Sequence, residues 1–218
     1  MTNNLQKIYE LRFIGLKKYR NSVWKILVNN FFERWIPKNS TILDLGCGYG
    51  EFINNVTAKD KHAMDLNPES QLHLEENIKF HEQDCSKPWQ VKPNTIDVIF
   101  TSNFFEHLPN KNTLDLTIEN ARIALKSNGV LIALGPNISV LNGKYWDFWD
   151  HHIPLTEQSL TELLEIHGFK ICHSYTRFLP YNMVRVNKRP LFLVRLYLRL
   201  PFLWRYFGKQ FFIVAIKP

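Results

Sequence analysis

Cysteine is scarce in this sequence, with three residues among 218. Cys47, Cys85 and Cys172 lie far apart, and no C-x-x-C pair occurs. Structural zinc sites and the disulfide frameworks of small secreted domains need closely or regularly spaced cysteines. We therefore expect three reduced, buried thiols, and neither a zinc centre nor a disulfide framework.

Internal repeats and low-complexity stretches are also missing. The first ten residues lack the charged and then apolar layout of a secretory signal peptide. Hydrophobic residues nevertheless make up 45% of the chain and aromatic residues 14%, which suits one globular domain with a complete core. We expect a single-domain protein in the cytoplasm.

Acidic residues are outnumbered, with 20 Asp and Glu against 27 Lys and Arg, so the formal net charge is +7. The basic excess lies in residues 7–25 and 185–209, whereas the middle of the chain is near neutral or acidic. Basic segments of this kind suit a nucleic acid or an anionic membrane surface. Charge alone leaves both partners open.

Strand and helix patterns alternate along the chain. We expect strands at 42–45, 61–65, 78–81, 95–101, 130–134, 169–176 and 210–216, and helices at 5–36, 51–56, 114–125 and 156–167. Thr156 and Ser159 form a capping pattern for the last of these helices, and Gly168 ends it. Alternating strands and helices predict an α/β protein with a mostly parallel sheet and helices on both faces.

The segment T-I-L-D-L-G-C-G-Y-G at residues 41–50 is the most informative stretch. A short apolar strand that contains Asp44 is followed by Gly46, Gly48 and Gly50, which predicts a sharp turn where the backbone approaches a ligand closely. Dinucleotide-binding folds use G-x-G-x-x-G instead, with the third glycine one residue later. An acid before the turn suits a ligand that carries a cationic ammonium group.

This order of residues resembles motif I of the class I S-adenosylmethionine (SAM) methyltransferases. The resemblance covers residues 40–176 by motif, and it implies a Rossmann-like, seven-stranded sheet with an antiparallel last strand. It also implies SAM as cofactor, S-adenosylhomocysteine as product and methyl transfer by in-line displacement. On this basis we divide the single domain into an N-terminal helical lid (1–37), a core (40–176), a basic and apolar helical insert (177–209) and the last strand (210–218).

Several residues become candidates for the cofactor site. Asp65 ends the second strand, where an acid can accept both ribose hydroxyls; capping of the turn at Pro68 is the alternative. The resemblance implies that Asp84 faces the adenine amine, although a solvated loop residue would look the same. The full set of candidates is Tyr19, Arg20, Asp44, Gly46, Cys47, Gly48, Gly50, Asp65, Leu66, Asp84, Cys85, Ser102 and Asn103.

Histidines mark the expected acceptor side. His107 follows the fourth strand in an E-H-L sequence that is similar to the loop after motif IV; capping of the next helix is the alternative. Tyr145, His151 and His152 lie in an aromatic loop with nearby acids, an arrangement that orients a general base. A purely structural loop would have the same composition. The adjacent histidines have no third ligand at zinc-like spacing, so we expect no metal.

Residues 190–208 combine Leu, Phe and Trp with Arg195, Arg199 and Arg205. The arginines make the segment too charged to cross a bilayer, and the pattern is typical of a helix at a membrane interface. Pro201 is expected to kink it. A helix packed on the protein's own core, or a dimer interface, is the alternative.

Hydroxyl acceptors must lose a proton, so the histidine-rich loop favours O-methylation. We expect a saccharide or other small polar acceptor, including a lipid-linked one, because aromatic side chains suit sugar faces. RNA methylation is the second possibility, but the N-P-P-Y and D-P-P-Y sequences suited to base amines are missing, so we do not expect a nucleic-acid partner. A non-catalytic SAM-binding protein and an NAD-dependent oxidoreductase are two further hypotheses.

Overall fold

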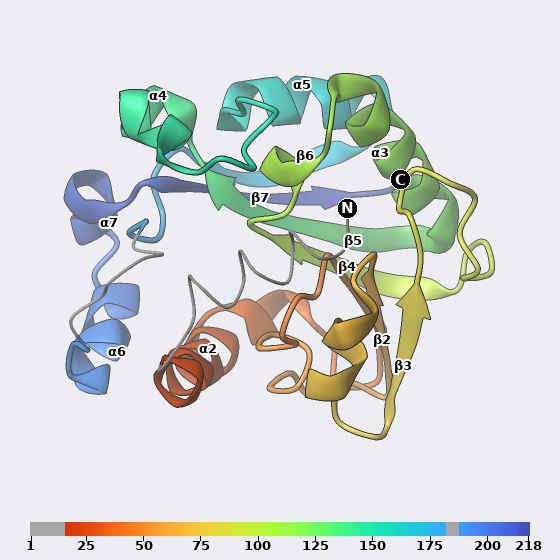
Figure 1. Ribbon diagram of the computed structural model, residues 1–218, viewed down its shortest axis with the longest axis horizontal. Helices are drawn as coiled ribbons and strands as arrows, with labels where there is room; N and C mark the ends of the chain where they lie inside the picture. Colours follow the sequence, from red (N-terminus) through yellow and green to blue (C-terminus); the bar gives the residue numbers. More distant parts are fainter. Residues whose placement is uncertain (1–15, 182–187) are drawn as a thin grey trace.

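The computed structural model describes residues 16–181 and 188–218. Its centre is a seven-stranded sheet in the order β3-β2-β1-β4-β5-β7-β6 (Figure 1). The strands are β1 (Thr41–Leu45), β2 (Asp60–Asp65), β3 (Ile78–Glu82), β4 (Ile96–Ser102), β5 (Leu125–Pro136), β6 (Lys170–Tyr175) and β7 (Gln210–Ile216). Neighbouring strands from β3 to β5 run parallel, and β7 is antiparallel to both β5 and β6. The expected Rossmann-like sheet with an antiparallel last strand is confirmed.

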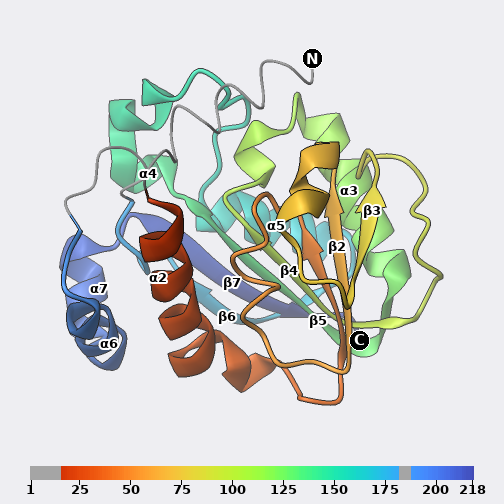
Figure 2. The same ribbon diagram turned by 60° about the horizontal axis from the view of Figure 1, so that its bottom comes forward.

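Helices cover both faces of this sheet. They are α2 (Lys17–Asn30), α3 (Lys111–Ala124), α4 (Ile138–Leu141), α5 (Glu157–Ile166), α6 (Leu191–Arg199) and α7 (Phe202–Phe207). Apolar residues of α3 and α5 form one core with one face of the sheet, and those of α2, α6 and α7 form a second core on the opposite face (Figure 2). Burial on both faces explains why β1 and β4 are apolar throughout most of their length.

Local signals account for the ends of α5. The Thr156 side chain accepts a hydrogen bond from the Ser159 amide, and the Ser159 hydroxyl accepts one from the Thr156 amide. Gly168 follows with a φ of +75°, in the left-handed region that terminates helices. These observations confirm the helix that the capping pattern predicts.

The expected helix at 51–56 is wrong. Residues 51–55 form turns only, with Asn54 N–H bonded to the Gly50 carbonyl at 2.9 Å. Short helices are costly to nucleate, and asparagine side chains compete for backbone partners. Here Asn54 donates to the His73 carbonyl at 2.8 Å, and Asn55 donates to the Asn21 side chain at 2.7 Å.

Two smaller differences concern the first helix and one cysteine. The helix expected at 5–36 ends at Asn30 and is followed by a 3-10 turn, Phe32–Trp35, while residues 5–15 lie outside the described residues. Cys47 and Cys85 are buried, but Cys172 is exposed. It lies on β6, which is one of the two edge strands of the sheet and has most of its side chains in solvent.

The expected helix at 190–208 is divided in two. Pro201 interrupts it, so that α6 ends at Arg199 and α7 begins at Phe202, in agreement with the expected kink. Leu198 and Trp204 turn inward and are only 6% exposed. Within the described residues, no helix has both the length and the apolar character that a membrane span requires.

Candidate functional site

The carboxyl ends of β1, β2 and β4 meet at one edge of the sheet. Leu45, the last residue of β1, pairs with Met64 of β2 on one side and with Thr101 of β4 on the other. The segments that follow these strands therefore lie together. In open α/β sheets this edge is where ligands bind.

The glycine turn after β1 requires glycine for steric reasons. Gly46 has a φ of +72° and Gly50 a φ of +69°, a region that other residues adopt only with strain. A Cβ atom on Gly46 would lie 2.3 Å from the ring of Phe104. Gly46 N–H also donates to the Met64 carbonyl at 2.9 Å, which fixes the turn against β2.

Asp65 holds this turn from the end of β2. One carboxylate oxygen accepts from Gly48 N–H at 2.8 Å, and the other accepts from Asn67 N–H at 2.9 Å. Burial raises the pKa of Asp65, while the hydrogen bonds from these amides oppose the increase. The following residue, Leu66, is 55% exposed. Asp65 is thus placed beside the glycine turn with further acceptor capacity on both oxygens.

A second carboxyl group lies under the turn. Asp44 is 3% exposed, and burial together with the charges of Asp65 and Glu51 holds its pKa well above the usual range. Arg20 of α2 pairs with Glu51, with 2.7 Å between Arg20 Nε and Glu51 Oε1. Three acids therefore converge on the glycine turn, an environment that favours a ligand carrying positive charge.

The segment after β4 contributes Ser102 and Asn103. Asn103 has a φ of +49°, and its amide donates to the Leu134 carbonyl at 2.8 Å. Its side-chain nitrogen donates to Ser102 Oγ at 2.9 Å. Among the described residues, the buried Oδ1 of Asn103 has no hydrogen-bond partner. This acceptor lies just after the carboxyl end of β4 and is therefore available to a donor of a bound molecule.

Asp84 and Cys85 follow β3. The exposed Asp84 accepts from the Ser86 amide at 2.9 Å and from the Ser86 hydroxyl at 2.8 Å, so it caps a turn. Burial raises the pKa of Cys85 to about 11 and raises the pKa of Cys47 well above its usual range. Both thiols stay protonated near neutral pH and are not nucleophiles.

Tyr19 lies where α2 meets the beginning of α6. Its hydroxyl donates to the Arg189 carbonyl and accepts from the Arg189 amide, both at 3.1 Å. Its neighbour Arg20 points elsewhere and contacts the segment that follows the glycine turn. The two consecutive candidates of α2 therefore have different partners.

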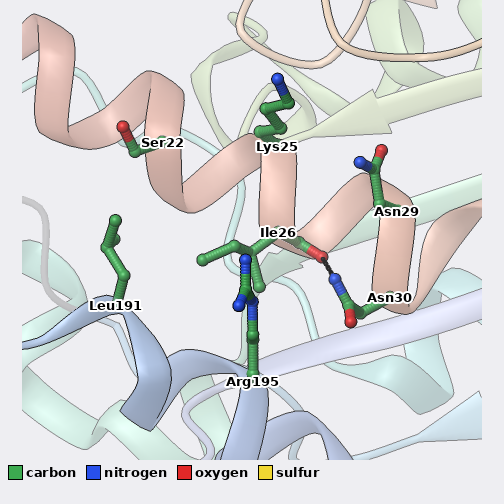
Figure 3. Close-up of a pocket in the computed structure, with 7 residues that line it drawn as sticks. All are labelled: Ser22, Lys25, Ile26, Asn29, Asn30, Leu191 and Arg195. Carbon is green, nitrogen blue, oxygen red and sulfur yellow. Dashed lines mark hydrogen bonds between the residues drawn. The ribbon is translucent and has the colours of Figure 1, made fainter.

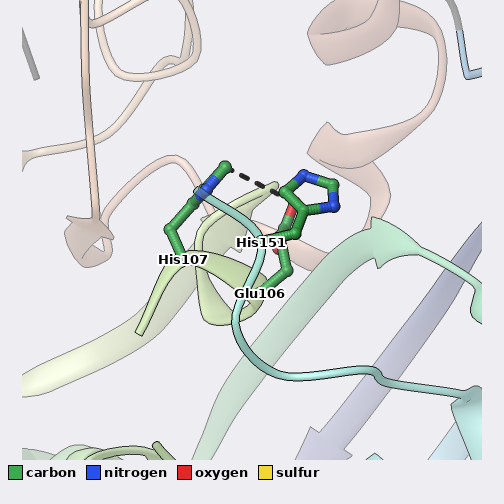
Figure 4. A group of neighbouring side chains, drawn as sticks. All are labelled: Glu106, His107 and His151. Atoms are coloured by element: carbon green, nitrogen blue, oxygen red, sulfur yellow. Dashed lines mark ion pairs between the residues drawn. The ribbon is translucent and has the colours of Figure 1, made fainter. Parts of the chain in front are cut away.

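A second group of polar side chains lies in the segments that follow β4 and β5. It consists of Glu106, His107 and His151 (Figure 4), with Asp150 next to His107. His107 Nδ1 lies 3.2 Å from Asp150 Oδ2, and His107 Nε2 lies 3.9 Å from Glu106 Oε1. Glu106 is only 2% exposed, whereas 26% of the His107 side chain remains accessible. The rings of His151 and His107 meet edge to face, with their centres 5.0 Å apart and an angle of 66° between their planes. One donor atom from each of Glu106, His107 and His151 lies within 4.8 Å of the others, so this cluster is also a possible metal-binding group.

Electrostatics set the protonation of His107. Burial lowers its pKa, but the hydrogen bond to Asp150 and the charges of Glu106 and Asp150 outweigh burial, so its pKa is raised above the usual value. A histidine that is oriented by a carboxylate through one nitrogen can exchange a proton through the other. The geometry is therefore that of a general base with its orienting acid.

The three candidates of the aromatic loop differ in their accessibility. Tyr145 is fully buried and its hydroxyl donates to the Ile153 carbonyl, so it holds the loop together. His151 is 5% exposed, and its Nε2 lies 3.3 Å from the Tyr181 hydroxyl. The His152 side chain is exposed, although its backbone amide donates to the Glu106 carbonyl at 2.8 Å. The fold therefore brings His107 and His151 together and leaves the His152 side chain in solvent.

Sequence reasoning missed Asp150, Phe104 and Tyr181 as members of this edge. Asp150 was visible only as one of the acids flanking the histidines, because its partner His107 is 43 residues away. Phe104 covers Gly46, and no local pattern distinguishes it from a core residue. Tyr181 follows the sixth strand, and nothing in the sequence around it indicates a contact with His151.

Comparisons with known proteins agree with this geometry. A family model described as a methyltransferase domain matches residues 16–174. An uncharacterised protein of Methanocaldococcus jannaschii is 34% identical over 149 residues, which cover 66% of this chain and 61% of that protein. The match therefore spans less than two thirds of that relative's length.

Proteins of known structure that share this fold have different activities. A SAM-dependent methyltransferase from Archaeoglobus fulgidus is similar with a TM-score of 0.68 and 18% identity, over 94% of this chain and 99% of that one. The 4+2 cyclase SpnF is similar with a TM-score of 0.64 and 16% identity, over 100% of this chain and 96% of that one. At these identities the likeness shows the fold, and the chemistry must be argued from the site.

Proposed function

This chain belongs to the methyltransferase-domain family and has the fold of SAM-dependent methyltransferases, and from that premise we propose that it methylates a hydroxyl group of a small polar acceptor. The observation that carries the proposal is the Asp150–His107 pair, which lies in segments that follow β4 and β5 at the sheet edge that also carries the glycine turn. Hydroxyl acceptors need a base, and this pair supplies one. We place the enzyme in the cytoplasm, as its composition leads us to expect.

The residues at the glycine turn fit SAM as the cofactor. When bound, SAM supplies a methyl group activated by a sulfonium. The free acceptor capacity of Asp65 suits the two ribose hydroxyls, and the buried Oδ1 of Asn103 suits the ammonium group. Burial and the charges of Asp65 and Glu51 raise the pKa of Asp44, and a cationic ligand bound above the turn would stabilise the ionised form of this carboxyl group. Asp84, Cys85 and Leu66 are the candidates for the adenine side.

Catalysis by this chain combines positioning with proton transfer. Holding an acceptor oxygen in line with the reacting carbon contributes up to about 7–11 kcal/mol. In our proposal His107 Nε2 takes the hydroxyl proton, and Asp150 holds the ring in the required tautomer. Tyr145 is a positioning residue, because its buried hydroxyl fixes the loop that carries Asp150. A base in this position contributes about 10²–10⁴-fold.

The same loop also supports a proposal for the acceptor class. Trp146 and Trp149 are 52% and 92% exposed, although tryptophan is usually buried. Flat aromatic rings suit the apolar faces of sugars, so we propose a saccharide as the favoured acceptor. The net charge of +7 is the observation that keeps RNA as the second candidate.

The experiment is calorimetric titration with SAM, S-adenosylhomocysteine and NAD, followed by a methyl-transfer screen of sugar and RNA acceptors. We expect micromolar binding of the first two ligands, no binding of NAD, and transfer to a sugar hydroxyl that is lost in His107→Gln. SAM binding with no transfer to any acceptor would favour a non-catalytic SAM-binding protein. Loss of transfer in EDTA, restored by a divalent cation, would assign Glu106, His107 and His151 to a metal instead of a base.

A further inference from the structure

The C-terminal quarter of the chain contains no acid. Residues 167–218 include Lys170, Arg177, Arg185, Lys188, Arg189, Arg195, Arg199, Arg205, Lys209 and Lys217, and no Asp or Glu. Within the described residues, no ion pair involves Arg195, Arg199 or Arg205. An excess of positive charge in one part of a protein points to an anionic partner.

Large apolar side chains accompany these arginines on the outside of the molecule. Phe192 and Leu196 of α6 are 63% and 47% exposed, and Phe202, Tyr206 and Phe207 of α7 are between 58% and 68% exposed. We call these five residues the docking face. The opposite side of the same helices is anchored, because Leu198 and Trp204 belong to the core. The docking face is therefore held in place by packing and presented to solvent.

A cavity between α2 and α6 has two basic residues in its lining. It has a volume of about 240 Å³ and lies between α2 and α6, where Lys25 and Arg195 line it together with Ser22, Asn29 and Asn30 (Figure 3). Ammonium, guanidinium, hydroxyl and amide groups are all donors to phosphate oxygens. None of the described residues that line this cavity is acidic.

A second cavity flanks α7. Its volume is about 330 Å³, and it lies between the end of β6 and α7. Arg177 and Arg205 line it together with the hydroxyls of Ser174, Tyr175 and Thr176. Each of the two short helices thus lines a cavity with an arginine, Arg195 of α6 in the first and Arg205 of α7 in the second.

We propose that α6 and α7 bind the surface of an anionic lipid bilayer, with the docking face in the interfacial region and lipid phosphates in the two cavities. Aromatic and leucine side chains enter the headgroup and acyl boundary, and arginines beside them pair with phosphates. A second copy of the chain is a poorer partner, because it would bring the same arginines face to face. This proposal does not depend on the chain being an active methyltransferase.

The sheet topology links this surface to the catalytic edge. Gln210, the first residue of β7, pairs with Pro136, the last residue of β5, so α7 leads into the edge at which the parallel strands end. Tyr181, which precedes α6, contacts His151. Figures 1 and 2 both show α4, α7 and α6 along one side of the molecule. If the proposed function holds, docking brings the acceptor loop to the bilayer, which suits a lipid-linked saccharide.

The test is sedimentation of the full chain with vesicles of phosphatidylglycerol and phosphatidylcholine, and with vesicles of phosphatidylcholine alone. We expect binding to the anionic vesicles that weakens as salt is raised, and little binding to the neutral vesicles. The triple variant Arg195→Gln, Arg199→Gln, Arg205→Gln should bind at least tenfold more weakly, because each basic residue near the surface contributes about fivefold. Phe202→Ser with Phe207→Ser should also reduce binding, but without changing its salt dependence.

Matched controls separate surface binding from general charge. The variant Lys38→Gln, Lys59→Gln, Lys111→Gln removes the same charge from exposed positions outside α6 and α7. Leu72→Ser removes an apolar side chain that is 80% exposed and also lies outside these helices. Both should bind vesicles as the wild type does. No vesicle binding by the folded wild-type protein would overturn the proposal, as would equal loss in the lysine control. Self-association that buries the docking face and excludes vesicles would also overturn it.

Discussion

At the scale of single residues, Asp65 has two tasks. It fixes the glycine turn through the Gly48 amide, and in our proposal it accepts the ribose hydroxyls. Both tasks need the carboxylate at the carboxyl end of β2. Loss of this side chain should therefore affect both the shape of the cofactor site and its affinity.

We predict that Asp65→Ala weakens SAM binding at least tenfold in calorimetry, because each charge-assisted hydrogen bond contributes about 1.5–3 kcal/mol. Glu82→Ala is the matched control, since Glu82 is the register partner of Asp65 on β3 and is exposed. The control should bind SAM with unchanged affinity. Unchanged affinity in Asp65→Ala would remove the ribose assignment.

The His107–Asp150 pair predicts a pH dependence. A base must be neutral, and the pKa of His107 is raised, so the transfer rate should increase as pH rises through this pKa and then level off. Asp150→Asn removes the carboxylate that raises the pKa, so the inflection should move to lower pH. His107→Gln should abolish the inflection and slow transfer about 10²–10⁴-fold.

The same pair has a stability consequence with a defined sign. Since the folded pKa of His107 lies above its value in the unfolded chain, the pair stabilises the fold fully below about pH 6.5. This contribution is lost as pH rises through the folded pKa. Denaturant unfolding at several pH values measures it, and a difference between wild type and Asp150→Asn that grows with pH would contradict the assignment.

At the scale of elements, α5 depends on its N-terminal cap. We predict that Thr156→Ala lowers the free energy of unfolding by about 1 kcal/mol, because the Ser159 amide loses its partner. Urea unfolding measures this change. Thr57→Ala, at an exposed position outside helices and strands, should change stability by less than about 0.5 kcal/mol. Equal effects of the two substitutions would show that the capping box does not stabilise α5.

At the scale of the whole molecule, the cofactor should stabilise the fold. The buried carboxyl group of Asp44 lies near the charges of Asp65 and Glu51, and bound SAM would bring positive charge to this acidic edge. At a SAM concentration 100 times Kd, mass action adds about 2.7 kcal/mol, which corresponds to about 5–10 °C in Tm for a domain of this size. NAD at the same concentration should leave Tm unchanged, and an equal shift with NAD would contradict SAM specificity.

Local patterns in the sequence determined much of the protein. The glycine turn, the capping box of α5, the break at Pro201 and all seven strands follow from residues close together in the chain. Alternation of strands and helices is compatible with few topologies, and the resemblance to motif I predicted the antiparallel last strand, which the structure confirms. The prediction of a short helix at 51–56 was wrong because the helix propensity of this segment is weak. Hydrogen bonds of Asn54 to His73 and of Asn55 to Asn21 stabilise a turn there instead.

Only the tertiary structure decided which side chains meet. Asp150 orients His107 across 43 residues, and the burial of Tyr145 and the exposure of His152 depend on how one loop packs against the sheet. The exposure of Cys172 also depends on tertiary structure, because β6 lies at an edge of the sheet. The orientation of α6 is a further example, since its inner side packs on α2 while Phe192 faces solvent. Sequence patterns indicate which backbone conformation a segment prefers and how its apolar residues are spaced. Burial and contacts between distant residues depend on how whole helices and strands pack together.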